Sequence, residues 1–238
     1  MNKLLATSAC AALVVGAVMT NSPFALADTP TTTQERSVSS FDQVKLRGSM
    51  DVEIKVGPAR SVTVIADSDI IDRIETEVEG DELVIGLERG HSYRNIRKML
   101  VKVTVPDLTD VDLTGSGDME ITGLERKDFG MSLRGSGDIT LKSADVDDLD
   151  INLKGSGDIV ASGSCDTVTV NLAGSGDIDA RDMRCKSADV TLKGSGDVTV
   201  YASDMADVLL QGSGDVSVHG DPDKVSSKVR GSGDVEVR

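Results

Sequence analysis

Residues 151–161 read Ile-Asn-Leu-Lys-Gly-Ser-Gly-Asp-Ile-Val-Ala, and the tetrapeptide at their centre decides the fold. Gly-Ser-Gly-Asp occurs seven times in the chain, with successive copies 20, 20, 19, 20, 18 and 19 residues apart. The first glycines of these copies are Gly115, Gly135, Gly155, Gly174, Gly194, Gly212 and Gly231, and a degenerate copy starts at Gly48. Self-similarity at a nearly fixed period indicates a repeat architecture.

Apolar residues alternate with polar residues on both sides of each turn. The positions two before the first glycine are Leu113, Leu133, Leu153, Leu172, Leu192, Leu210 and Val229. The positions four after it are Met119, Ile139, Ile159, Ile178, Val198, Val216 and Val235. A period of two is typical of a strand with one buried face. The sequence therefore predicts one strand that enters each turn and another that leaves it.

The repeat length limits how these strands are connected. Two strands of about five residues and two turns use the whole repeat, so no packed helix fits. A helical crossover between parallel strands needs about a dozen residues. A coil that places each strand beside its equivalent one repeat later needs none. We therefore predict an all-β parallel β-solenoid, or β-helix, with coils of about 20 residues stacked about 4.8 Å apart. An antiparallel meander is the alternative, and it would not stack identical residues.

The glycines of each turn allow a sharp corner between two sheets. The aspartates that close the turns should form one external column: Asp118, Asp138, Asp158, Asp177, Asp197, Asp215 and Asp234. Neighbouring carboxylates about 4.8 Å apart repel by about 0.9 kcal/mol in water, so the column needs compensation.

Two hypotheses supply that compensation. Aligned carboxylates and turn carbonyls could hold a ladder of calcium ions. Alternatively, nearby turn amides donate hydrogen bonds to the carboxylates, and basic residues directly before the turns neutralise them. Those basic residues are Arg47, Arg134, Lys154, Lys193 and Arg230. We favour the second hypothesis, because a basic residue stands directly before five of the eight turns and the nine-residue period of calcium-binding β-rolls is absent, and we expect no cofactor.

An outward polar column stands three positions before the glycines and comprises Ser132, Asn152, Asn171 and Thr191. It is either a solvated strand face with hydrogen bonds between coils or a binding face for a repetitive ligand. The Gly-x-Gly of the turn is no phosphate-binding loop, because a third glycine and a following helix are missing.

The chain divides into four parts. Residues 1–27 contain Lys3, an apolar run and Ala25-Leu26-Ala27, the pattern of a cleaved signal peptide. Residues 28–35 are expected to be a disordered leader. Residues 36–110 should form irregular N-terminal coils and a cap, with a turn of helix between 70 and 78, and residues 111–238 the regular solenoid. We expect export beyond the inner membrane to the periplasm, the outer surface or the medium, with a mature chain that is not embedded in a membrane.

Two cysteines occupy equivalent places in neighbouring repeats. Cys10 leaves with the signal peptide, whereas Cys165 and Cys185 each stand nine residues before the first glycine of a turn. Equivalent positions about 4.8 Å apart fall within the Cα separation of about 4.4 to 6.8 Å that a disulfide spans. An oxidising compartment favours this bond. We predict a disulfide, and two buried free thiols are the alternative.

Composition excludes several classes of function. Forty acidic residues against 25 basic ones give a net charge of −15, which repels nucleic acids and anionic lipid surfaces. Aromatic residues make up 2% of the chain, and Trp is absent. Polysaccharide-active β-helices often use aromatic sugar platforms beside clustered acids. We therefore expect a protein that is not an enzyme, with a polysaccharide-active enzyme as the less favoured alternative.

Four features together resemble one bacterial family. They are Phe41 through the Gly48 turn, the segment 74–87, Val105-Pro106-Asp107-Leu108 and the tandem turns. These resemble the head GIN domain family of autotransporter-adhesin-like proteins over roughly residues 36–238. The resemblance implies a right-handed parallel β-helix, export and a role in adhesion, the last by fold-level analogy, and it brings no catalytic residues.

These expectations combine into one functional hypothesis. We expect an exported, non-catalytic interaction module of the cell envelope, with a divalent-cation-stabilised structural protein as the alternative. The strand around Val235 and Val237 presents unpaired backbone groups, and such an edge invites pairing. Self-association or binding to another envelope or surface macromolecule is therefore expected, and nucleic acid is not expected as a partner.

Overall fold

The computed structural model describes residues 30–90 and 96–238, most of them in β-strands. The expected signal peptide lies outside the described residues. The strands of the N-terminal half are β1 (Thr31–Arg36), β2 (Gln43–Gly48), β3 (Asp51–Val56), β4 (Ser61–Asp67), β5 (Ile74–Glu79), β6 (Glu82–Leu87), β7 (Met99–Val105), β8 (Asp110–Gly115) and β9 (Met119–Thr122). The remaining strands are β10 (Glu125–Gly135), β11 (Ile139–Gly155), β12 (Ile159–Gly174), β13 (Ile178–Gly194), β14 (Val198–Gly212), β15 (Val216–His219), β16 (Lys224–Gly231) and β17 (Val235–Val237). No helix in the described part has the length and apolar character needed to cross a bilayer.

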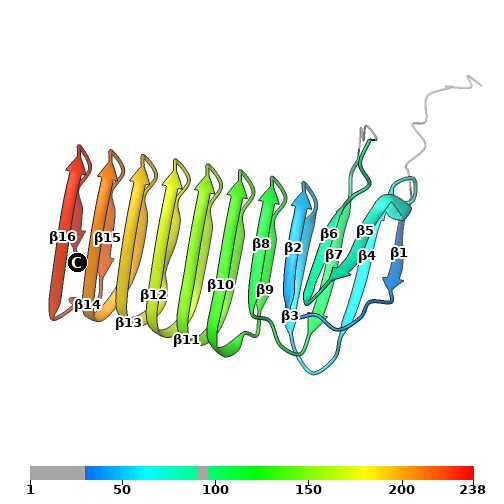
Figure 1. Ribbon diagram of the computed structural model, residues 1–238, viewed down its shortest axis with the longest axis horizontal. Helices are drawn as coiled ribbons and strands as arrows, with labels where there is room; N and C mark the ends of the chain where they lie inside the picture. The colour runs from blue at the N-terminus through cyan, green and yellow to red at the C-terminus, as the bar shows by residue number, and fades with distance from the viewer. Residues whose placement is uncertain (1–29, 91–95) are drawn as a thin grey trace, which may run out of the picture.

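The strands form a flattened stack of coils with two walls (Figure 1). We call the wall whose strands run toward the Gly-Ser-Gly-Asp turns the front sheet. In spatial order it contains β5, β6, β2, β8, β10, the second parts of β11–β14, and β16. The rear sheet leaves the turns and contains β1, β4, β7, β3, β9, the first parts of β11–β14, β15 and β17. The four longest strands, β11–β14, run through both walls.

Equivalent residues stack in register from coil to coil. Leu133 pairs with Leu113 on one side and with Leu153 on the other, and all three are fully buried. The same holds along the rear sheet, where Ile139 pairs with Met119 and with Ile159. The pairings from β8 to β17 are parallel, so the predicted parallel β-solenoid is confirmed. Its core is a thin layer of Leu, Ile, Val and Ala between the two walls.

The N-terminal end is built differently, because its strands reverse direction. β2 lies between β8 and β6, and β3 lies between β9 and β7, all in parallel. Outside them the pairs β5–β6, β4–β7 and β1–β4 are antiparallel. The single 3-10 turn η1 (Ile71–Arg73) lies beside β1 and β4, and buried Ile70, Ile71 and Ile74 extend the core there.

Two local expectations differ from the structure. Within the segment 28–35, the described residues from Thr31 onward form β1, not a disordered leader, because their backbone pairs with β4. The Nη2 atom of Arg36 donates a 2.8 Å hydrogen bond to the carbonyl of Ile71, which fixes the end of β1. Between 70 and 78 only Ile71–Arg73 are helical, and Ile74–Glu79 form β5, because pairing with β6 satisfies their backbone.

Candidate functional site

From Gly115 onward, the corner of each coil requires glycine at two positions. Gly155 has a φ of +146°, and a Cβ built there would overlap the carbonyl oxygen of Gly135 in the preceding coil. A Cβ on Gly157 would likewise overlap the carbonyl oxygen of Gly137. The exposed serine between them donates its backbone N–H to the preceding coil, as Ser156 does to Gly135 at 2.9 Å. Close stacking of backbones therefore selects the glycines, and the serine and aspartate form the outer edge.

The aspartates of the turns form one hydrogen-bonded ladder. In each aspartate from Asp118 to Asp215, the carboxylate Oδ1 accepts a hydrogen bond from the backbone N–H of the aspartate one coil later. The lengths run from 3.2 Å for Asp138 to Asp118 down to 2.8 Å for Asp234 to Asp215. The intermediate bonds join Asp158 to Asp138, Asp177 to Asp158, Asp197 to Asp177 and Asp215 to Asp197. Backbone amides therefore stabilise the charges that the stacking brings together.

The basic residues before the turns do not take part in this ladder. Arg134 pairs with Asp112 on the front sheet instead. Within the described residues, Arg47, Lys154, Lys193 and Arg230 make no ion pair with the aspartate column. Of the two parts of the compensation hypothesis, the structure contains the hydrogen bonds from turn amides and lacks the ion pairs. No group of three or more His, Cys, Asp or Glu side chains in the described ranges has an arrangement that could hold a metal ion.

Cys165 and Cys185 lie opposite each other on neighbouring strands β12 and β13. The structure joins them in a disulfide with a Cα separation of 4.4 Å. Both side chains are buried. Because the two residues occupy the same place in successive coils, the bond ties one coil to the next.

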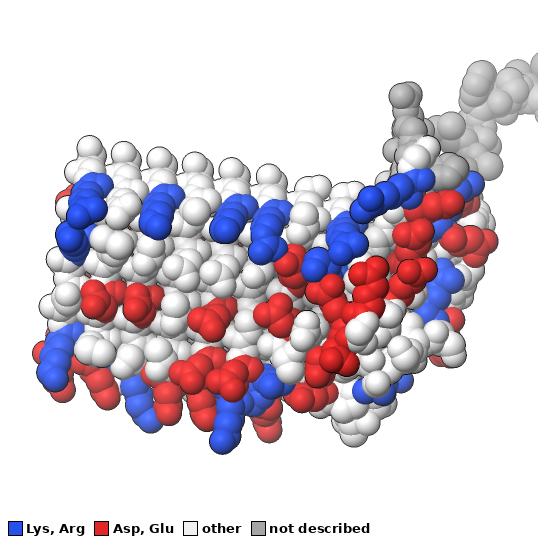
Figure 2. All heavy atoms as spheres, in the orientation of Figure 1, with Lys and Arg blue, Asp and Glu red and all other residues white. Residues whose placement is uncertain are grey.

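The outer face of the front sheet carries three rows of side chains, which we name by their chemistry. The basic row stands one position before the glycines and includes Arg47, Arg134, Lys154, Lys193 and Arg230. The polar row stands three before and includes Ser132, Asn152, Asn171 and Thr191. The acidic row stands five before and includes Asp110, Asp150, Asp189 and Asp207. Figure 2 shows the basic and acidic rows as separate bands.

The polar row brings together the four residues that the sequence placed in one column. They lie side by side on β10, β11, β12 and β13. The expected side-chain hydrogen bonds between coils are absent from these four residues in the part of the chain that the structure describes. Their polar groups therefore remain available to solvent or to a ligand.

Asp110, in the acidic row, was not singled out by its sequence. Burial is the main cause that raises its pKa from 3.8 to about 6, and the nearby charges of Asp112 and Glu82 raise it further. Its neighbour Gly130 has no side chain, and a Cβ there would overlap Oδ2 of Asp110. The sequence feature that could have pointed to Asp110 is Gly130, a glycine within an otherwise regular strand.

A shallow hollow on the rear sheet contains two carboxylates from neighbouring strands. It is lined by Glu53, Lys102, Glu120 and Thr122 among others. The Nζ atom of Lys102 lies 2.7 Å from Glu53, and that of Lys142 lies 2.8 Å from Glu120. Each carboxylate is therefore held in an ion pair with a lysine.

Comparison with known proteins gives one family and several similar folds. The family described as "Putative auto-transporter adhesin, head GIN domain" matches residues 40–222. No curated protein matches the chain.

Several solved structures share the architecture. A "putative adhesin" from Bacteroides fragilis NCTC 9343 has a TM-score of 0.82 at 22% identity, with 88% of this chain and 97% of that chain covered. A "putative adhesin" from Parabacteroides distasonis ATCC 8503 has a TM-score of 0.76 at 21% identity, over 89% and 98% of the two chains. A "putative lipid binding protein" from the same organism has a TM-score of 0.73 at 26% identity, over 89% and 98%. At identities this low, the two adhesin structures show a common fold and nothing finer.

Proposed function

Because this chain belongs to the auto-transporter adhesin, head GIN domain family, we propose that it is an exported, non-catalytic module that binds another macromolecule of the cell envelope or surface. The binding surface is the outer face of the front sheet. The family description supports an adhesin-like role in general. The choice of surface rests on the arrangement of side chains in this chain.

The observation that carries the proposal is the repetition of one chemistry from coil to coil on the front sheet. The basic row and the acidic row flank the polar row, so several coils offer related groups at the same three positions, spaced by multiples of about 4.8 Å along the stack. Lys154 and Lys193 form no ion pair within the described residues, and the polar row forms no side-chain hydrogen bond there. Unpaired groups at a regular spacing suit an extended polymer whose own charged and hydroxyl groups repeat.

The state of the carboxylates supports a role without catalysis. Glycoside hydrolysis uses two carboxyl groups, one of which must donate a proton and therefore needs a raised pKa. The neighbouring carboxylates Glu53 and Glu120 are each held in an ion pair with a lysine. The raised pKa of Asp110 comes mainly from burial, and Asp110 does not line the hollow that contains Glu53 and Glu120.

Two features support export. The composition of residues 1–27 fits a signal peptide, and the Cys165–Cys185 disulfide suits an oxidising compartment.

A binding experiment with charge-reversed variants tests the proposed surface. Purified protein is mixed with isolated envelope fragments of the producing bacterium, and the bound fraction is measured after sedimentation. The variant K154E/K193E reverses two charges in the basic row and should weaken binding at least about tenfold. The control K55E/K127E changes the net charge equally, at exposed lysines outside the rows, and should bind as the parent does.

Two results would overturn the proposed surface. One is equal binding by K154E/K193E and the parent protein. The other is an equal loss in both variants, which would mean that net charge alone controls the binding. Circular dichroism on both variants confirms that each is folded.

A further inference from the structure

The front sheet has a free strand edge at each end of the solenoid. β5 pairs only with β6, and β16 pairs only with β14, within the described residues. The outer edges of these strands therefore present backbone N–H and C=O groups without strand partners. Such an edge is a template for pairing with another chain unless it is blocked.

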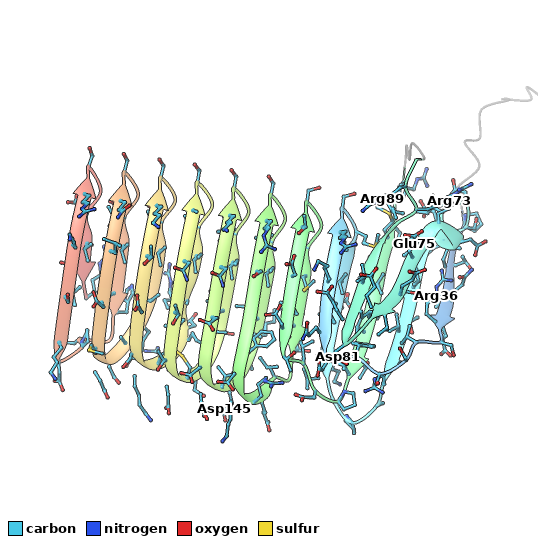
Figure 3. All side chains as sticks on the ribbon, in the orientation of Figure 1. Arg36, Arg73, Glu75, Asp81, Arg89 and Asp145 are labelled. Atoms are coloured by element: carbon cyan, nitrogen blue, oxygen red, sulfur yellow. A yellow bond between two sulfur atoms is a disulfide. The ribbon has the colours of Figure 1, made fainter. Side chains whose placement is uncertain are left out.

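The two edge strands carry opposite charges. β5 exposes Glu75, Glu77 and Glu79, and β16 exposes Lys224, Lys228 and Arg230. Among the residues that the structure describes, none of these six side chains takes part in an ion pair. Figure 3 marks Glu75 at the N-terminal end of the stack, and Figure 2 shows acidic side chains gathered toward that end and a basic band that continues to the opposite end.

The register of the sheet places these charges in the same rows. Glu75 lies opposite Gly86, which belongs to the row that continues through Arg47 and ends at Arg230. Glu77 lies opposite Val84, which belongs to the row that continues through Lys45 and ends at Lys228. Two adjacent outward rows thus begin with a glutamate and end with a cation.

We propose that copies of this chain associate head to tail, with β16 of one copy pairing alongside β5 of the next. Stacking in the same orientation makes this pairing antiparallel, because β5 runs opposite to all other strands of the front sheet. It places Arg230 opposite Glu75 and Lys228 opposite Glu77. Residues directly opposite in an antiparallel pair have Cβ atoms about 4.5 to 5.5 Å apart, so both pairs lie within reach of an ion pair.

The same pairing covers apolar surface at the free end. Val229 is 43% exposed, whereas its equivalents in the preceding coils are fully buried. In the proposed pairing Val229 faces Thr76, which also points inward. On the outer face of the rear sheet, one row of paired residues begins with Glu35 in β1 and ends with Glu236 in β17. The charge of Glu236 is already neutralised by Arg238 in a 2.6 Å ion pair.

Symmetric association is disfavoured by the same charges. Pairing β16 with β16 of a second copy would bring Lys224, Lys228 and Arg230 against the same three cations. Pairing β5 with β5 would oppose three glutamates to three glutamates. Like charges directly opposite each other destabilise a strand pair. A head-to-tail contact is heterologous and leaves a free edge at each end, so it produces chains of copies and not closed dimers.

Sedimentation velocity over a range of protein concentrations tests the association. A small strand-edge interface should give growth beyond dimers at concentrations on the order of 10 to 100 µM, and higher salt should weaken it. The variants K228E/R230E and E75K/E77K should each associate at least about tenfold more weakly. An equimolar mixture of the two variants should associate again, because each acidic end then meets a basic end. The control K55E/K127E reverses two exposed charges away from both strand edges and outside the rows, and it should associate as the parent does.

Cysteine cross-linking tests the register. Under mild oxidation the variant E77C/K228C should form a ladder of covalent oligomers, whereas the control E77C should stop at dimers. The proposal is overturned if the parent protein remains monomeric, if association stops at a dimer, or if the mixture of reversed variants stays dissociated. Thermal unfolding of each variant confirms an intact fold. The association is tested separately from the proposed binding to envelope fragments. K228E/R230E and E75K/E77K change residues at the ends of the sheet, whereas the binding variant K154E/K193E changes the centre of the basic row.

Discussion

Oδ1 of Asp138 accepts a 3.0 Å hydrogen bond from the backbone N–H of Asp158, one coil further along the solenoid. The same bond recurs from Asp118 to Asp234, so each inner aspartate accepts from one coil and donates to the other. A column of like charges is thereby turned into a continuous chain of hydrogen bonds along the outer edge.

Replacing an inner aspartate should measure what one step of this ladder contributes. Asp158→Ala removes the acceptor for the backbone N–H of Asp177 and should destabilise the protein by about 1 kcal/mol in urea unfolding. Asp158→Asn should cost less, because its side-chain oxygen still accepts.

Asp234→Ala is the matched control, because no aspartate amide follows it in the described chain. Equal losses at Asp158 and Asp234 would contradict the ladder. Millimolar calcium should leave the melting midpoint unchanged relative to chelator, since each inner carboxylate is already bonded to an amide. A rise of many degrees would favour a cation-stabilised column instead.

The corner glycines give a second prediction. Gly155→Ala places a Cβ on the carbonyl oxygen of Gly135 and also forces an unfavourable φ, so we expect a loss of more than about 3 kcal/mol or no folded protein. Gly48→Ala shares the positive φ, +137°, but nothing lies within 4 Å of its Cβ. It should lose only about 1 to 2 kcal/mol from backbone strain. Equal melting temperatures for the two variants would argue against close backbone stacking as the reason for the glycines.

The cysteine pair predicts a thiol count. The exported protein, denatured without reductant, should show no free thiol, and two free thiols would contradict the disulfide. Cys165→Ser/Cys185→Ser opens a loop with a sequence separation of 20 residues. In the chain-entropy account this lowers the free energy of unfolding by about 3 kcal/mol.

Asp110 predicts a pH-dependent stability. Its pKa is about 6 in the folded protein against an ordinary value of 3.8, so ionisation opposes folding. The contribution of protonated Asp110 to the free energy of unfolding is complete at pH values below the pKa of this residue in the unfolded chain. It is lost as the pH rises through about 6. Because the side chain is partly exposed, we expect Asp110→Asn to stabilise the protein by only about 1 to 2 kcal/mol at pH 7.5. This gain should shrink toward pH 4, whereas Asp150→Asn in the same row should change little. A gain independent of pH would contradict the assignment.

The regular coils could be predicted because one signal determines them. A two-residue alternation around a repeated turn permits only one register, and that register places Leu133 on Leu113 and Cys165 beside Cys185. The partners of the aspartates could not be read from the sequence. In the sequence they stand close to both basic residues and turn amides, and only the three-dimensional corner decides between these partners.

The N-terminal cap was harder to predict because its strands do not repeat. Ile70, Ile71 and Ile74 have a helix-like spacing, yet only Ile71–Arg73 form a helical turn. Glu75, Glu77 and Glu79 alternate as a strand does, but no second copy of that pattern supports this interpretation. β1 is polar throughout, so its pairing with β4 depends on backbone hydrogen bonds that composition does not reveal.

Cell fractionation with surface labelling tests the account's central claim, a role in the cell envelope, most directly. Antibody against the protein is applied to intact cells and to separated fractions, and mass spectrometry identifies the N-terminus. The account predicts a chain that begins near Asp28, lies beyond the inner membrane and is labelled on intact cells. A chain that retains residues 1–27 and remains in the cytosol would contradict it, and a strictly periplasmic chain would rule out adhesion to another cell.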